Sequence, residues 1–225
     1  MTDDNQKQHV TIDIVSDVMC PWCHIGRKRL NDALSELGDD IKTTVHWLPY
    51  QLDATLPKEG KNRQQYFIDK FGSLDAHEQI YAPINEAGKA EEIPFRLNDI
   101  TVSPNTLDAH RLIFWAGRDH GSDMQNKLVN ILMQFYFEQG KHIGDDDVLV
   151  EAAEHAGMPG EKTRYMLASD ESKEVIQNQI ETIKSSGVNG VPVFILNKKY
   201  ALEGAQSKSV IRDTIQEVIK LSESD

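Results

Sequence analysis

The chain has 225 residues, which is enough for one large domain or for a domain that carries an insertion. Hydrophobic residues make up 39% and charged residues 27%, so the composition supplies a core and excludes the disordered and fibrous classes. The formal net charge is −12 and no basic stripe occurs, which argues against nucleic acid as a partner.

The sequence also predicts the compartment. No segment approaches the roughly 20 apolar residues of a membrane span, so we expect no membrane partner. Residues 1–6 are polar and acidic and lack the basic start and apolar run of a secretory signal. Only two cysteines occur, whereas a secreted domain stapled by disulfides uses more. These features together predict a cytoplasmic protein.

The first predicted elements form a strand–helix–strand unit. Apolar residues alternate with polar ones from Val10 to Ile14, which indicates a strand that buries one face. A helical pattern follows the segment Cys20 to Cys23 and stops at Gly38. The alternation returns from Ile41 to Trp47 and predicts a second strand. The cysteine pair therefore lies where the helix begins.

The middle region, residues 56–185, shows helical periodicity throughout. Ser103-Pro104 is typical of a helix N-cap followed by a first-turn proline. Phe135 to Phe137 fall at helical spacing, which favours ordinary core over a cofactor site. The three aspartates at 145–147 favour a helix N-terminus over a metal site. We therefore expect an all-helical insertion here.

The last region restores the strand pattern. Residues 193–196 are apolar, Asn197-Lys198 predicts a turn, and residues 200–202 return as the second strand of a hairpin. Residues 207–221 carry an apolar stripe and predict a closing helix. Two strand-containing ends around a helical middle imply one sheet domain that is interrupted by the insertion.

The chemistry concentrates on Cys20 and Cys23. A helix start brings residues i and i+3 to the Cα separation of about 4.4–6.8 Å that a disulfide needs. The N–H groups and dipole of the helix N-terminus favour a thiolate at Cys20 and lower its pKa. Pro21 suits the first helical position because its missing N–H would have no partner there. We expect Cys20 to be the exposed nucleophile and Cys23 the sheltered resolving thiol.

Three other interpretations of the pair compete with this one. A structural zinc site takes four ligands, and this pair supplies two, with no second pair and only scattered histidines; we expect no metal. Cys20 to His24 also matches the Cys-x-x-Cys-His pattern of covalent haem attachment, although a strand running into a helix at the motif weighs against it. Two inert buried cysteines would leave Pro21-Trp22 at the helix cap unexplained.

Three blocks of the sequence resemble one known family. They are Asp13 to Cys23, Ser103 to Leu112, and Gly187 to Phe194 with Gly204 to Gln206. They are similar to DsbA-like proteins of the FrnE branch, which is related to 2-hydroxychromene-2-carboxylate isomerase and the kappa-class glutathione transferases. The resemblance covers nearly the whole chain. It implies an α/β, thioredoxin-like fold formed by residues 1–55 and 186–225, with an inserted all-helical domain at 56–185.

The resemblance adds expectations that spacing cannot supply. It implies a cis bond between Val191 and Pro192 that faces the cysteine pair, although only about 5–6% of X–Pro bonds in folded proteins are cis. The backbone of Val191 would pair with an extended substrate, beside Pro21 and Trp22. Asn105 matches a position that helps to hold glutathione in the isomerase and transferase relatives. A first-turn role in a helix explains Asn105 equally well.

One departure from those relatives bears on the reaction. They carry a serine where this chain has Cys20, and a serine can orient a glutathione thiolate but cannot form a disulfide. The prediction is therefore a thiol–disulfide oxidoreductase, with disulfide isomerase activity included. Its partners would be protein or small-molecule thiols and disulfides, with glutathione as a co-substrate and no bound cofactor. A glutathione-dependent isomerase or transferase and a non-catalytic binding module stay as alternatives.

Three polar residues flank the pair. We expect His24 on the exposed surface of the helix rather than as a charge that tunes Cys20. Ser16 and Asp17 are expected to serve as cap and turn residues. The sequence leaves the direction of electron flow open, because potentials in this fold spread over some 150 mV and about 30 mV already corresponds to 1.4 kcal/mol.

Overall fold

The computed structural model describes residues 8–38, 40–73 and 76–222. The expectation about a secretory signal rests on residues 1–6, which lie outside the described residues. The larger sheet has four strands in the order β2-β1-β5-β6. These strands are β1 (Gln8–Ser16), β2 (Ile41–Pro49), β5 (Val193–Leu196) and β6 (Tyr200–Glu203). β1 runs parallel to β2 and antiparallel to β5, and β6 is antiparallel to β5.

The strand–helix–strand unit forms as predicted. The apolar side chains of β1, such as Ile12 and Ile14, are buried in the core. Parallel strands cannot be joined by a tight turn, and helix α1 (Pro21–Ser35) provides the crossover from β1 to β2. The register places Ser16 opposite Pro49, so both strands end at the same edge of the sheet. The chain continues from this end of β1 into the turn that leads to Cys20.

The C-terminal hairpin and closing helix are also confirmed. Asn197 and Lys198 form the turn between β5 and β6 with positive φ angles of 50° and 58°. Such angles give a turn whose twist matches that of the flanking strands, and asparagine tolerates them well. Helix α9 (Lys208–Ser222) follows and buries Ile211, Ile215 and Val218.

The region between β2 and β5 is almost wholly helical. Its helices are α2 (Arg63–Phe71), α3 (Ala76–Ala90), α4 (Leu107–His120), α5 (Ser122–Phe137), α6 (Asp146–Ala156), α7 (Gly160–Leu167) and α8 (Lys173–Ser185), with a short 3-10 helix at Leu97–Asp99. Two short strands, β3 (Lys61–Asn62) and β4 (Val102–Ser103), pair with each other within it. The division of the chain into 1–55 with 186–225, and 56–185, stays a prediction, although all four strands of the larger sheet lie in the two outer parts.

One predicted helix start is wrong. Ser103 lies in β4 rather than at a helix cap, because it pairs with Lys61 and its hydroxyl accepts a hydrogen bond from Arg63. Helix α4 begins at Leu107, whose backbone N–H is bound by the Asn105 side chain. A cap pattern in the sequence does not reveal a strand partner about 40 residues away.

Two other predictions for this region are confirmed. The Asp145 carboxylate caps α6 by accepting from the backbone N–H groups of Asp147 and Val148. The aromatic residues Phe135 to Phe137 are at most 3% exposed and belong to the core.

No helix within the described residues combines the length and apolarity that crossing a bilayer requires.

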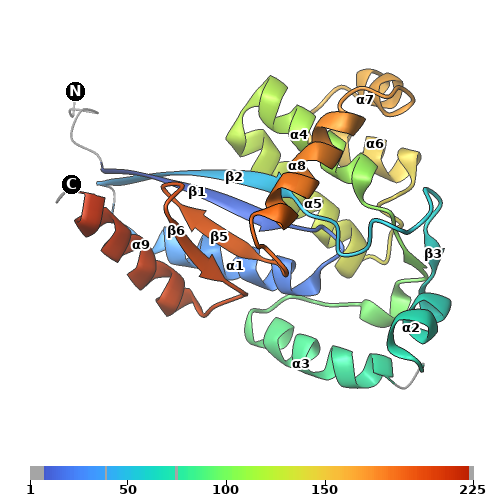
Figure 1. Ribbon diagram of the computed structural model, residues 1–225, viewed down its shortest axis with the longest axis horizontal. Coiled ribbons are helices and arrows are strands. Elements are labelled where there is room, and N and C mark those ends of the chain that lie inside the picture. The colour runs from blue at the N-terminus through green and yellow to red at the C-terminus, as the bar shows by residue number, and fades with distance from the viewer. Residues whose placement is uncertain (1–7, 39, 74–75, 223–225) are drawn as a thin grey trace.

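The helices form layers around the sheet (Figure 1). Helices α1 and α9 lie side by side and α9 contacts β1, while α4, α5 and α8 contact β2. Helix α3 also contacts α1 and lies below it in the view of Figure 1. The start of α1 is therefore surrounded by the ends of β1 and β2 and by segments of the insertion.

Candidate functional site

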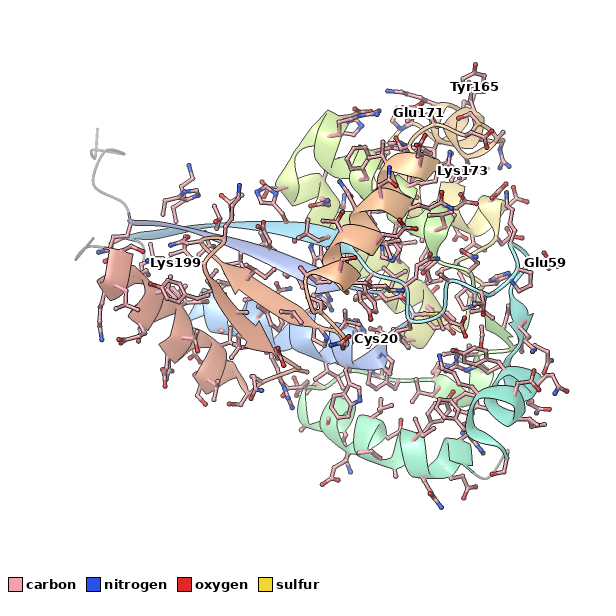
Figure 2. The ribbon with its side chains drawn as sticks, viewed as in Figure 1. Cys20, Glu59, Tyr165, Glu171, Lys173 and Lys199 are labelled. Atoms are coloured by element: carbon pink, nitrogen blue, oxygen red, sulfur yellow. The ribbon has the colours of Figure 1, made fainter. Side chains whose placement is uncertain are left out.

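The cysteine pair occupies the first turn of α1. Cys20 is the N-cap, with extended backbone angles (φ −93°, ψ 114°), and Pro21 follows at the first helical position. The carbonyl of Cys20 accepts from the N–H of Cys23 at 3.0 Å and from that of His24 at 3.3 Å. Figure 2 shows Cys20 at this end of α1, away from the β5–β6 turn that Lys199 marks. The local sequence thus builds the helix start as predicted.

The expected exposure of Cys20 is wrong. Cys20 is 4% exposed and Cys23 is 1% exposed, and both are free thiols. Cys20 is covered in part by the loop before β5, since its thiol donates to the carbonyl of Val191 at a sulfur–oxygen distance of 3.7 Å. Pro21 and Trp22, between the cysteines, are half-buried. Burial of Cys20 depends on a residue 171 positions away, which no local pattern reports.

Cys23 is the sheltered member of the pair. Burial raises the pKa of the Cys23 thiol well above its ordinary value, and Cys20 raises it further by hydrogen bonding and by charge. The Ser16 hydroxyl and the backbone of Asp17 act in the opposite direction on this pKa without overcoming burial. The Ser16 hydroxyl is buried and makes no hydrogen bond to the described residues, so it acts on the Cys23 pKa only by lying close to the thiol. Cys23 is thus protonated while the pair is reduced at neutral pH.

The raised pKa of Cys23 predicts how the stability of the reduced protein depends on pH. A group that binds its proton more tightly when folded stabilises the protein fully below the unfolded pKa, here about 8.5, and loses this contribution as the pH rises toward the folded pKa. Compared with Cys23→Ser, the reduced wild-type protein should lose up to about 1.4 kcal/mol of unfolding free energy per pH unit above this value. Denaturant unfolding of both proteins in reductant, across this pH range, measures the difference. Parallel curves would contradict the raised pKa.

The loop before β5 forms the opposite wall of the site. The Val191–Pro192 bond is cis, as the family resemblance implied, and the contact of Val191 with Cys20 places this loop at the pair. An open hollow of about 510 Å³ lies along the loop, bounded by residues 187–193, by Glu203 at the end of β6 and by Gln206 beyond it. Cys20 is therefore brought to the loop of Val191 and Pro192, and this loop borders the hollow.

Gly26 keeps this wall close to α1. A Cβ atom at Gly26 would lie 3.1 Å from Cγ of Pro192 and 3.2 Å from the Phe194 ring, so any side chain there requires these neighbours to shift by a few tenths of an ångström.

Substitution of Gly26 should therefore disturb both stability and exchange. Gly26→Leu cannot fit unless Pro192 moves, and such overpacking costs about 1–3 kcal/mol of unfolding free energy. Gly26→Ala should fall between wild type and Gly26→Leu, both in unfolding free energy and in the rate at which Cys20 exchanges with a disulfide reagent. A Gly26→Leu protein with the wild-type exchange rate would show that the spacing of this wall is unimportant.

Asn105 is not brought to the thiols by any contact in the described part of the chain. Its side-chain oxygen accepts from Leu107 N–H and from Gln51, and its amide donates to the carbonyl of Leu56. These bonds fix the start of α4, which is the first-turn alternative given by the sequence. A glutathione-binding role for Asn105 stays a prediction.

The expected exposure of His24 is wrong as well. The ring is fully buried, stacked on Phe137 and edge-on to Phe95. One ring nitrogen lies 2.9 Å from Glu138 and the other 3.4 Å from Arg27. Burial lowers the pKa of His24, against the opposing effect of Glu138, so the ring is neutral at neutral pH. His24 therefore gives Cys20 no charge.

Metal and haem interpretations find no support in the donor set. No group of three or more His, Cys, Asp or Glu side chains within the described ranges is arranged to hold a metal ion. Both nitrogens of His24 are already engaged by protein groups, which leaves neither for a haem iron. The expectation that the site holds no metal or bound cofactor stays a prediction.

Two buried polar residues near the pair were underestimated from the sequence. Asp17 is fully buried. Its carboxylate accepts from Met19 N–H, which is the expected turn role, and also from the N–H of Leu52 in a distant segment. His110, 4% exposed on α4, lies 3.5 Å from it. The sequence signal was their presence in two of the three blocks that carry the family resemblance.

A dithiol at the start of a helix, packed on a β-α-β unit and faced by a cis-proline loop, defines a thioredoxin-fold protein with a Cys-x-x-Cys site. The chain belongs to the family described as DSBA-like thioredoxin domain, whose model matches residues 11–216.

Solved structures agree with this assignment. A probable DsbA oxidoreductase from Streptomyces coelicolor has a TM-score of 0.82 and 26% identity, over 93% of this chain and 89% of that one. A 2-hydroxychromene-2-carboxylate isomerase follows at 0.73 and 14%, over 95% and 98%. The cytosolic disulfide reductase DsbM from Pseudomonas aeruginosa, solved with GSH, gives 0.63 and 14%, over 93% and 99%. The last two likenesses show a shared fold.

Proposed function

We propose that this protein is a thiol–disulfide oxidoreductase that works through Cys20 and Cys23. The observation that carries the proposal is the asymmetry of the two free thiols. Cys20 caps a helix and touches the Val191 loop, which borders the open hollow, whereas Cys23 lies behind it with a pKa raised by burial. A nucleophile beside open space and a protonated thiol in reserve are what disulfide exchange requires.

The reaction proceeds in two exchange steps. In the reducing direction the Cys20 thiolate attacks one sulfur of a substrate disulfide. A bond to Cys20 forms, the substrate S–S bond breaks, and the other substrate sulfur leaves and takes up a proton. Cys23 then loses its proton and attacks the Cys20 sulfur, which releases the first substrate sulfur as a thiol. The substrate gains two electrons and two protons, and the protein is left with a Cys20–Cys23 disulfide.

The hollow and its loop give the substrate a place to bind. An extended segment beside Val191 would lie next to Cys20, with backbone groups of the loop as partners in the manner of strand addition. Pro21, Trp22 and Pro192 would border the same segment. Protein disulfides and small disulfides both suit an open site of this kind. Disulfide isomerisation belongs to the proposal, because a Cys20 mixed disulfide can pass to a second substrate thiol before Cys23 reacts.

The proposal needs no metal or bound organic cofactor, because the two sulfurs carry the electrons. A thiol such as glutathione would reset the oxidised pair as a co-substrate. The fold shared with a disulfide reductase described as cytosolic and solved with GSH supports both this resetting thiol and the prediction of a cytoplasmic protein.

The decisive experiment is an equilibrium with glutathione buffers followed by turnover of insulin disulfides. We expect Cys20 and Cys23 to interconvert fully between dithiol and disulfide, with a measurable potential, and we expect catalysis of insulin reduction in the presence of glutathione. A potential well above the cytosolic range of about −220 to −320 mV would favour oxidation of substrates instead. Failure of the pair to form a disulfide, together with glutathione-dependent turnover by Cys20→Ser, would support the isomerase or transferase alternative.

A further inference from the structure

The carboxylate of Asp17 is held by three separate segments of the chain. It accepts from the backbone N–H of Met19 at 3.3 Å within its own turn and from that of Leu52, beyond β2, at 2.8 Å. The ring nitrogen Nε2 of His110, on α4, lies 3.5 Å from it. Asp17 is fully buried, and no Lys or Arg side chain among the described residues pairs with it. Burial of a carboxylate costs free energy unless hydrogen-bond donors surround it, and this network supplies such donors.

The backbone of Asp17 contacts both cysteines. Its carbonyl accepts from the N–H of Cys20 at 3.0 Å, which sets the N-cap residue in place. Its backbone also faces the Cys23 thiol closely enough to lower the pKa of that group. Movement of Asp17 would therefore move the nucleophile and the resolving thiol at the same time.

His110 connects this turn to the helical insertion. Its Nε2 donates to the carbonyl of Tyr50 at 2.8 Å and lies 3.5 Å from the Asp17 carboxylate. The N–H of Tyr50 donates to Ser16, so the same residues also close the ends of β1 and β2. One imidazole thus joins α4 to both strand ends that carry the site.

We propose that Asp17 is the positioning residue for both thiols, and that His110 holds the Asp17 carboxylate so that the helical insertion sets the geometry of the redox pair. The inference rests on the proposed thiol–disulfide function. Its consequence lies in the second exchange step, because attack of Cys23 on Cys20 requires the two sulfurs in a fixed orientation, and a misplacement of 1 Å can cost about a hundredfold in rate.

The aromatic disulfide reagent DTNB separates the two steps in a single trace. Attack by Cys20 releases the first thionitrobenzoate, and resolution by Cys23 releases the second. Asp17→Asn replaces one acceptor oxygen by an amide NH2 group, which must face either Met19 N–H and His110 or the N–H of Leu52. We expect the second release to slow by about tenfold or more and the first to change by less than about threefold. A residue with a merely structural role would lower the unfolding temperature and leave the second rate of the folded protein unchanged.

Variants of His110 test the link to the insertion and cover the case in which Asp17→Asn does not fold. His110→Gln keeps an N–H at the same reach and should stay within about twofold of wild type, whereas His110→Leu should slow the second release as Asp17→Asn does. Asp53→Asn makes the same chemical change at a nearby carboxylate that accepts its hydrogen bonds from Thr55 and lies outside the Asp17 network. It serves as the matched control.

The outcomes separate this inference from the proposed function. Wild-type rates of the second release in folded Asp17→Asn and His110→Leu proteins would overturn the positioning role. Equal slowing in His110→Gln and His110→Leu would overturn the link through His110. A wild-type protein that releases thionitrobenzoate without forming the Cys20–Cys23 disulfide would instead refute the oxidoreductase proposal itself.

Discussion

Cys23→Ser is expected to accumulate covalent mixed disulfides between Cys20 and its substrates, whereas Cys20→Ser should form none. The difference follows from the separate environments of the two thiols. Cys20 lies at the helix cap and contacts the Val191 loop, which borders the open hollow, so we expect it to attack first. We expect Cys23, buried and protonated, to act only on a bond already formed at Cys20. Without Cys23 the first adduct has no internal means of release.

The measurement is a non-reducing gel of each variant recovered from cells, followed by mass spectrometry of the adducts. Adducts of Cys23→Ser should collapse when a reductant is added, and the Cys20→Ser, Cys23→Ser double variant controls for non-covalent association. Trapping through Cys23 in the Cys20→Ser protein would reverse the assignment of the nucleophile. Inert structural cysteines would give no adducts in either single variant.

Arg111→Ala is expected to lower the unfolding free energy by about 3–5 kcal/mol, because it removes one partner from a buried ion pair. The Arg111 side chain is fully buried, and its guanidinium lies 2.6 Å from the Asp108 carboxylate and 4.8 Å from the Trp115 ring. It also donates to four backbone carbonyls, those of Met166 and Leu167 at the end of α7 and those of Ser169 and Glu171 after it. One side chain thus holds α4 to the end of α7 and the loop before α8.

Arg118 provides a matched control on the same helix. Its side chain is 40% exposed and pairs with Asp119 and Glu171, and exposed pairs of this kind contribute about 0–1 kcal/mol. Chemical denaturation of the reduced proteins measures both variants, with the thiol exchange rate of the folded proteins as a second readout. A loss below about 1 kcal/mol for Arg111→Ala would mean that the loop relaxes and rebinds its carbonyls to water.

The sequence predicted three local features correctly: the alternation of β1, the helix start at Pro21 and the Asn197-Lys198 turn. Each depends on side chains within one turn or one strand, where the spacing of apolar residues and the backbone preferences of proline and asparagine decide the conformation. The family resemblance added the cis bond at Pro192. The reactive pair could be named for the same reason, because its chemistry lies in a segment of four residues.

The tertiary structure alone decided which of these residues are hidden from solvent. Cys20 is covered by Val191, and His24 is enclosed by Phe137 and bound by Glu138, residues that are more than 100 positions away. Helical periodicity gives the face on which a side chain lies, but not whether another segment covers that face.

For the same reason, the sequence did not reveal the roles of the polar residues Asp17, His110 and Ser103. Asp17 and His110 are unremarkable as single residues in the sequence, and they acquire a role only because α4 brings His110 to the turn after β1 and to Tyr50 at the end of β2. Ser103 had the pattern of a helix cap, but its pairing with Lys61 and its bond from Arg63 placed it in a strand. The sequence by itself determined the elements and the dithiol. Packing between distant segments determined burial, the partners of the charged groups, and thus the separate roles we assign to the two thiols.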